Sequence, residues 1–191
     1  MPPREKVSKE QVLNTAFEMT REDGFGDLTA RKLAQRLGSS TQPIFRAYDN
    51  MEMLRRDLFF KSVEFFSDYM IKKKGQTTPI YLSMGMAYIE LARKEKYLFE
   101  LLTSIDDYGE EAALSNLLKD EQEEILNRLP DADVLEMEQK RELLLMISLF
   151  IHGMATLLTS GRVTMSDKEV RLLLTKAYDG FLKSITDISD S

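Results

Sequence analysis

The chain contains no cysteine and no tryptophan, and only one of its 191 residues is a histidine. Without cysteine there is no disulfide framework, no thiolate-ligated zinc and no thiol nucleophile. A di-metal helical bundle would need Glu-x-x-His pairs, and the sequence contains neither such a pair nor a glycine-rich phosphate-binding loop. We therefore predict a protein that is not an enzyme and that uses neither a metal nor a cofactor.

The sequence also lacks a secretory signal, because residues 1–10 are polar. The longest apolar run, 143–158, is short for a membrane span and is interrupted by Ser148, His152, Gly153 and Thr156. We therefore expect a soluble, cytoplasmic protein with no membrane partner. A chain of this length with 43% hydrophobic and 30% charged residues can bury a sizeable core.

Apolar residues recur at helical spacing along the chain, and no strand-like alternation or internal repeat is visible. This pattern predicts an all-α fold of about nine helices. Ser8 with Gln11 forms a capping box, so the first helix should begin near Lys9, and Asn50 caps a long fourth helix. The later helices are expected near 79–94, 96–104, 108–129, 134–160 and 167–185.

Between the first and fourth helices lie two short helices joined by a tight turn. Thr29 caps the first of them, and Gly38 ends it at the C′ position. Ser40 caps the second, whose first turn holds residues 41–43. This is the helix-turn-helix layout, which places the second short helix in the major groove of DNA.

In such a domain the second short helix reaches the base edges, where a glutamine can pair bidentately with adenine. Polar and basic residues around it would hold phosphates and so position the helix. The predicted DNA-binding residues are Thr29, Arg31, Ser40, Thr41, Gln42, Phe45 and Arg46.

This N-terminal stretch resembles the TetR family of transcriptional repressors. The residues that carry the resemblance are Ala16, Gly24, Leu28, Thr29, Arg31, Leu33, Ala34, Leu37, Gly38, Ser40, Ile44, Phe45, Tyr48, Asn50, Glu52 and Leu54. The family usually has Tyr-x-His-Phe where this chain has residues 45–48, and Lys in place of Met51. Those family residues are phosphate contacts, so their replacement predicts a shallow salt dependence of DNA binding. Segments 88–99 and 150–155 are more weakly similar to the WHG-type C-terminal domain of the family.

The charge is unevenly distributed. Residues 1–56 hold ten Lys and Arg against eight Asp and Glu, whereas 57–191 hold 16 against 24. A basic N-terminal segment followed by an acidic remainder is typical of a DNA-binding protein. An excess of only two positive charges over residues 1–56 can also arise by chance. The DNA interpretation requires a shared face for Arg4, Lys6, Lys9, Arg31, Lys32, Arg36 and Arg46.

The predicted helix over 134–160 is apolar on two adjoining sides. One stripe contains Leu144, Ile147, Ile151, Met154 and Leu158, and the other Leu145, Leu149, His152 and Thr156. A helix apolar on nearly all sides must be covered on nearly all sides. We expect Ile147 and Ile151 to be exposed in the single chain and to form a homodimer interface. The alternative is a core that covers both stripes within one chain.

Methionine and aromatic residues concentrate in the middle helices. Flexible methionine side chains accommodate different shapes and can line a pocket for a small hydrophobic effector. Composition alone favours ordinary core packing, and a lone histidine on an apolar helix is more often a satisfied core residue than a ligand contact. The family resemblance implies a pocket. Its predicted residues are Met84, Tyr88, Tyr97, Leu102, Met146 and His152.

Three functions are compatible with these patterns. The first is a DNA-binding repressor released by a hydrophobic effector, with a helix-turn-helix domain over residues 1–50 and an effector-binding and dimerisation domain over 51–191. The second is a helical ligand- or partner-binding protein whose degenerate head no longer binds DNA. The third is a cofactor-free enzyme that uses the pocket.

Overall fold

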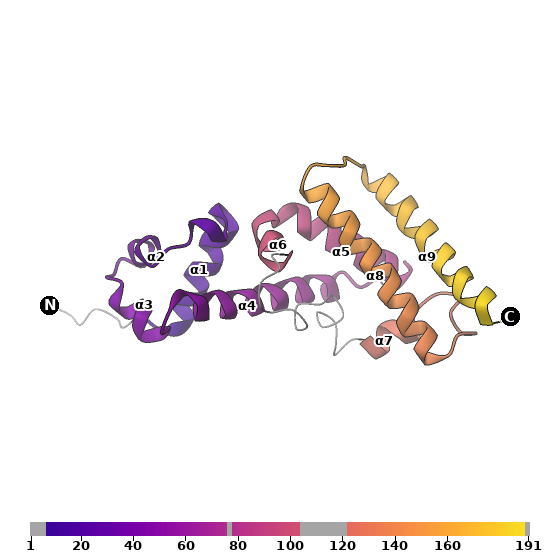
Figure 1. Ribbon diagram of the computed structural model, residues 1–191, viewed down its shortest axis with the longest axis horizontal. Helices are drawn as coiled ribbons and strands as arrows, with labels where there is room; N and C mark the ends of the chain where they lie inside the picture. The colour runs from indigo at the N-terminus through magenta and orange to yellow at the C-terminus, as the bar shows by residue number, and fades with distance from the viewer. Residues whose placement is uncertain (1–6, 76–77, 104–121, 190–191) are drawn as a thin grey trace. The chain divides into compact units, whose positions relative to one another are not determined.

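The computed structural model describes residues 7–75, 78–103 and 122–189. Over these ranges the chain forms nine α-helices and one short 3₁₀ helix, with no strand, which confirms the all-α prediction (Figure 1). The elements are α1 (Lys9–Asp23), η1 (Phe25–Asp27), α2 (Ala30–Arg36), α3 (Gln42–Ala47), α4 (Met51–Lys72), α5 (Ile80–Lys94), α6 (Lys96–Thr103), α7 (Gln122–Asn127), α8 (Met137–Thr159) and α9 (Asp167–Ser189).

The chain divides into two compact units. Among the described residues, the first unit comprises 7–65 and 95–103, and the second comprises 66–75, 78–94 and 122–189. The division falls within α4 rather than at residue 50, where the sequence pattern placed a domain boundary. The first unit also includes α6, because this helix packs on α1 and η1.

The predicted caps of the first unit are largely as expected. The Ser8 side chain accepts from the Gln11 backbone and the Gln11 side chain accepts from the Ser8 backbone, which confirms the capping box. Gly38 adopts a φ of 61°, and the amides of Gly38 and Ser39 close a Schellman motif on the last turn of α2. The prediction for Ser40 is wrong, because α3 begins at Gln42 and its N-cap is Thr41.

The core of the first unit is built around α1, which packs against α2, α3, η1 and α6. Phe17 of α1 meets Phe65 of α4 edge to face, with ring centroids 5.5 Å apart. The apolar side chains that fill this core are Val12, Ala16, Leu33, Ala34, Ile44 and Leu54. Burial of α1 on several sides fixes the two short helices that follow it.

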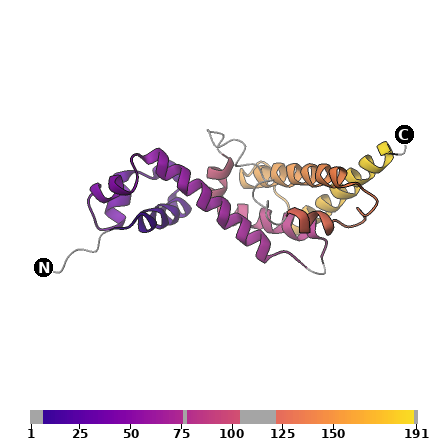
Figure 2. The same cartoon turned by 90° about the horizontal axis from the view of Figure 1, so that it is seen from below.

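In the second unit α5, α8 and α9 pack against one another (Figures 1 and 2). Gly85 of α5 allows this close packing, since a Cβ there would lie 2.9 Å from Ile151 Cδ1. The Tyr81 and Tyr178 rings stack with centroids 3.9 Å apart. The Tyr178 hydroxyl donates to the Pro130 carbonyl over 2.7 Å, so this buried polar group is satisfied.

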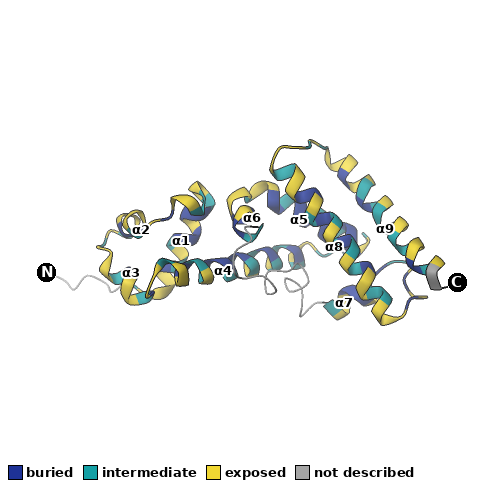
Figure 3. Ribbon diagram, in the orientation of Figure 1, coloured by how far each residue is buried: buried dark blue, intermediate teal, exposed yellow. Residues whose placement is uncertain are grey.

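The burial of α8 corrects the prediction about its two stripes. Ile147 and Ile151 are buried, with exposed fractions of 1% and 6%, and belong to the core of the second unit. The exposed leucines are Leu145, Leu149 and Leu157, so the outward face lies on the other side of α8 (Figure 3). Within the described ranges α8 is the one helix long and apolar enough to cross a membrane, judged by length and composition alone.

Candidate nucleic-acid interface

The orientation of α3 is set by Ile44, its buried side chain, and by Tyr48, which directly follows the helix. Ile44 and Tyr48 are 1% and 2% exposed and face the core of the first unit. Residues three and four positions apart share a face of a helix, so Gln42, Phe45 and Arg46 lie together. All three are exposed. The second short helix therefore presents an amide, an aromatic ring and a guanidinium on one outward face.

The first turn of α2 carries the other predicted contacts. The Thr29 side chain caps the helix by accepting from the Lys32 amide at 3.2 Å. Arg31 follows in the same turn and is exposed. Ser40 and Thr41, in the turn that joins the two helices, are exposed as well. The seven predicted DNA-binding residues therefore lie in α2, in α3 or in the residues that directly precede these helices. Among them, Arg31 is the cation in the first turn of α2.

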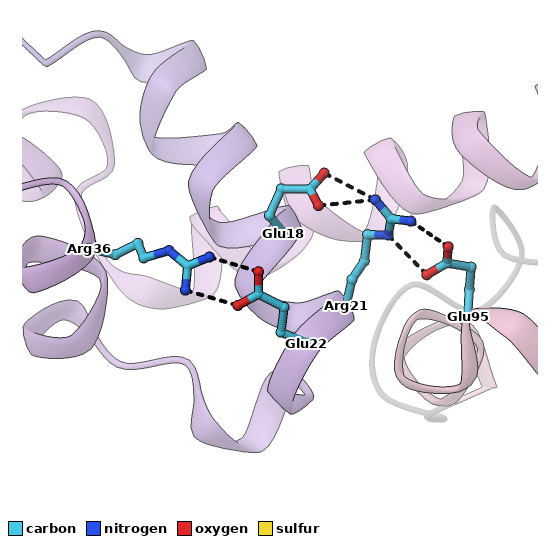
Figure 4. A network of polar contacts seen from close by, with 5 residues as sticks. All are labelled: Glu18, Arg21, Glu22, Arg36 and Glu95. Atoms are coloured by element: carbon cyan, nitrogen blue, oxygen red, sulfur yellow. Dashed lines mark hydrogen bonds and ion pairs between the residues drawn. The ribbon is translucent and has the colours of Figure 1, made fainter.

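Ion pairs and ring contacts with other side chains separate the described cations of the first unit into two groups. Lys9 pairs with Asp57 at 2.8 Å and Lys32 with Asp27 at 2.8 Å. Arg36 donates to both oxygens of Glu22 at 2.9 and 2.7 Å, which lowers the pKa of the Glu22 carboxyl (Figure 4). These three cations are already partly neutralised by carboxylates of the same chain.

Arg31 and Arg46 form the second group. Neither makes a hydrogen bond, an ion pair or a ring contact with another residue of the described part of the chain. The shared basic face that the DNA interpretation requires stays a prediction, and the contacts show that Lys9, Lys32 and Arg36 are each paired with a carboxylate of the same chain. Arg4 and Lys6, which belong to the same expectation, lie outside the described residues.

The first unit also contains an ion-pair cluster that the sequence pattern did not reveal (Figure 4). Arg21 of α1 donates to the two carboxylate oxygens of Glu95 over 2.9 and 2.5 Å, and to Glu18 over 3.0 Å. These hydrogen bonds, led by the one to Glu95, raise the pKa of Arg21. The Glu95 side chain is only 13% exposed. No sequence signal links the two residues, since 74 positions separate them.

Two of the predicted effector-binding residues are brought together in the second unit. The Tyr88 hydroxyl lies 3.0 Å from His152 Nδ1. Tyr88 is 2% exposed, and burial raises the pKa of its hydroxyl. Burial lowers the pKa of His152, because it disfavours the charged imidazolium. Both shifts favour the uncharged forms, so the pair is neutral at pH 7. Met84 is buried in the same unit and Met146 is half-buried.

The other two predicted effector-binding residues, Tyr97 and Leu102, belong to the first unit. The Tyr97 ring packs beside Gly24, where an added Cβ would lie 3.1 Å from it. Leu102 is half-buried on α6. The described contacts therefore place Tyr97 in the packing of η1 and α6 and do not join it to Tyr88 and His152.

The burial of His152 predicts a pH dependence of stability. Its pKa in the folded chain lies below the ordinary 6.5, so the unfolded chain takes up a proton first as the pH falls. Stability should therefore decrease below about pH 6.5 and level off below the folded pKa. Denaturant titrations at pH 7.5 and 5.5 should show a larger loss for the wild type than for His152→Gln. An equal loss in both proteins would contradict this assignment.

Comparison with known proteins finds no family model and no curated protein that matches the chain. The assignment of function therefore rests on the geometry of α2 and α3 and on the sequence motif that builds them.

Proposed function

We propose that this chain is a sequence-specific DNA-binding transcriptional regulator of the TetR type. The observation that carries the proposal is the outward face of α3, where Gln42, Phe45 and Arg46 lie together; Arg31 of α2 is also exposed and has no side-chain partner among the described residues. Glutamine can hydrogen-bond to adenine and arginine can hydrogen-bond to guanine or phosphate. A helix-turn-helix places such side chains of its second helix in the major groove. The residues proposed to hold phosphates are Arg31 and Arg46, the two described cations of the first unit whose side chains have no hydrogen bond, ion pair or ring contact.

The proposed regulator is a cytoplasmic homodimeric repressor and not an enzyme. The dimer is supported by the exposed leucines of α8, since solvent-exposed apolar surface of this kind marks interaction sites. A small hydrophobic effector that releases the operator is supported by Tyr88 and His152, a neutral polar pair whose tyrosine is buried among the apolar side chains of α5. A helical ligand- or partner-binding protein with a degenerate head is the competing function, and direct measurement of DNA binding decides between them.

The test is DNA binding by the full chain as a function of salt. Double-stranded DNA selected from a random library is titrated by fluorescence anisotropy at several salt concentrations. Arg31 and Arg46, the unpaired arginines in the described part of each DNA-binding unit, give four phosphate contacts per dimer, so log K should fall with a slope of about −3.6 against log salt. Either Arg31→Ala or Arg46→Ala should reduce the slope to about −1.8.

Arg36→Ala is the matched control, because Arg36 lies on the same unit but is already paired with Glu22. Its slope should stay near that of the wild type. A slope that falls as much for Arg36→Ala as for Arg46→Ala would show that the intramolecular pairs do not decide which cations bind phosphate. Selection of no duplex by the wild type would overturn the proposed function and leave the ligand- or partner-binding protein.

A further inference from the structure

We propose that Phe45 recognises the C5-methyl group of a thymine that lies beside the adenine read by Gln42. This inference rests on the proposed DNA-binding function and deepens it. It makes Phe45 a specificity-determining residue, and it predicts an adenine and a thymine at neighbouring base pairs in each half-site of the operator.

The first step is the exposure of Phe45. Its side chain is 48% exposed, on a short helix that is held to the core by buried Ile44 and followed by buried Tyr48. The ring cannot turn inward without displacing those two residues. Scattered exposed apolar residues are common on protein surfaces, but this one lies between Gln42 and Arg46 on the face proposed to meet DNA.

The second step is the chemistry of the ring. Phenylalanine has no hydrogen-bond donor and so cannot bind a phosphate oxygen. Any favourable contact that it makes must therefore bury apolar surface. In the major groove, thymine is the base that offers a methyl group, and a phenylalanine ring is among the side chains that contact it. A thymine methyl is thus the group on the DNA that matches Phe45.

The third step is the spacing along α3. Gln42 and Phe45 are three residues apart on one helical face, and a rise of about 1.5 Å per residue separates them by about 4.5 Å along the axis. Base pairs in B-DNA are about 3.4 Å apart. With α3 lying along the groove, Phe45 then faces the base pair adjacent to the adenine that Gln42 pairs with. Arg46 lies on the same face, one residue beyond Phe45, and binds a phosphate of the DNA backbone.

The test replaces each thymine of the selected operator, one at a time, by deoxyuridine, which pairs identically but lacks the methyl group. Removing one buried methyl should weaken binding of the wild type about fourfold at a single thymine per half-site. That thymine should lie next to the adenine whose replacement affects the wild type but not Gln42→Ala.

Phe45→Ala and Phe45→Gln should bind the thymine and deoxyuridine operators equally, because neither variant has a ring to contact the methyl group. Met53→Ala is the matched control: Met53 is another exposed apolar residue of the first unit, 45% exposed, and its loss should leave the fourfold difference intact. Circular dichroism of each variant checks that the helices are retained.

A fourfold difference that persists in both Phe45 variants, or a wild type insensitive to every thymine, would overturn the role of Phe45. Either result leaves the proposed function standing, since the wild type still selects a duplex in a salt-dependent manner. If the wild type selects no duplex at all, the proposed function fails, and the role of Phe45 fails with it.

Discussion

Glu95→Ala is expected to lower the free energy of unfolding of the first unit by about 2–3 kcal/mol. Removal of the carboxylate leaves the Arg21 guanidinium without the partner that accepts two of its hydrogen bonds, in a site where Glu95 is 13% exposed. The guanidinium also lies over the Phe17 and Phe65 rings at 5.8 and 5.5 Å, and the Arg21 side chain is 33% exposed, so water satisfies only part of what Glu95 leaves unpaired. Glu18 remains as a partner and limits the loss.

Hydrogen exchange of the α1 and α6 amides measures this effect in the first unit alone, and denaturant titration followed by circular dichroism measures it for the whole chain. Glu22→Ala is the matched control, because Glu22 makes an equally bidentate pair with Arg36. Both of those side chains are about half exposed, at 47% and 50%, so this pair should contribute little. If Glu95→Ala and Glu22→Ala lower the free energy of unfolding equally, the burial of Glu95 does not strengthen its ion pair with Arg21.

The caps show which parts of the fold the sequence predicts well. Ser8 with Gln11 forms the predicted reciprocal hydrogen bonds, and Asn50 accepts from the Met53 amide at 2.9 Å. Each of these bonds joins residues three positions apart, so the local pattern contains all the information needed. The start of α3 was misplaced by one residue because Ser40 and Thr41 are both competent caps.

The ion pairs show what the sequence cannot predict. Arg36 meets Glu22 and Arg21 meets Glu95 across 14 and 74 positions, so these partners depend on the packing of α1 against α2 and α6. The same limit explains the error on α8. Both of its stripes are apolar, and the choice between them depends on Gly85 of α5, whose missing side chain makes room for Ile151.

Leu149→Arg is expected to convert the proposed dimer into a monomer with its fold intact. Leu149 is 64% exposed, so the charge should cost the single subunit no more than about 0.5 kcal/mol of stability. In a dimer the same arginine would be buried against apolar surface without a partner, which is strongly unfavourable. Light scattering should show half the molar mass, and circular dichroism should show unchanged helix content.

The position of Leu149 on α8 is the reason for choosing it. Leu145, Leu149 and Leu157 recur at multiples of four residues, and Gly153 completes the row. A Cβ at Gly153 would meet no atom of the described chain within 4 Å, so a second helix can approach closely at this point. Leu172 of α9 is exposed in the same unit, at 53%, and can extend the apolar surface.

Dissociation should also weaken operator binding. A dimer holds two heads on paired half-sites, and this bivalence strengthens binding by a factor of about a hundred or more. The Leu149→Arg monomer should therefore lose at least that factor on a two-half-site operator and keep the affinity of one head for a single half-site. Ile147→Arg provides the contrast, since Ile147 is 1% exposed and its replacement should unfold the second unit. A wild type that is monomeric, or a Leu149→Arg protein that stays dimeric, would remove this face of α8 from the interface.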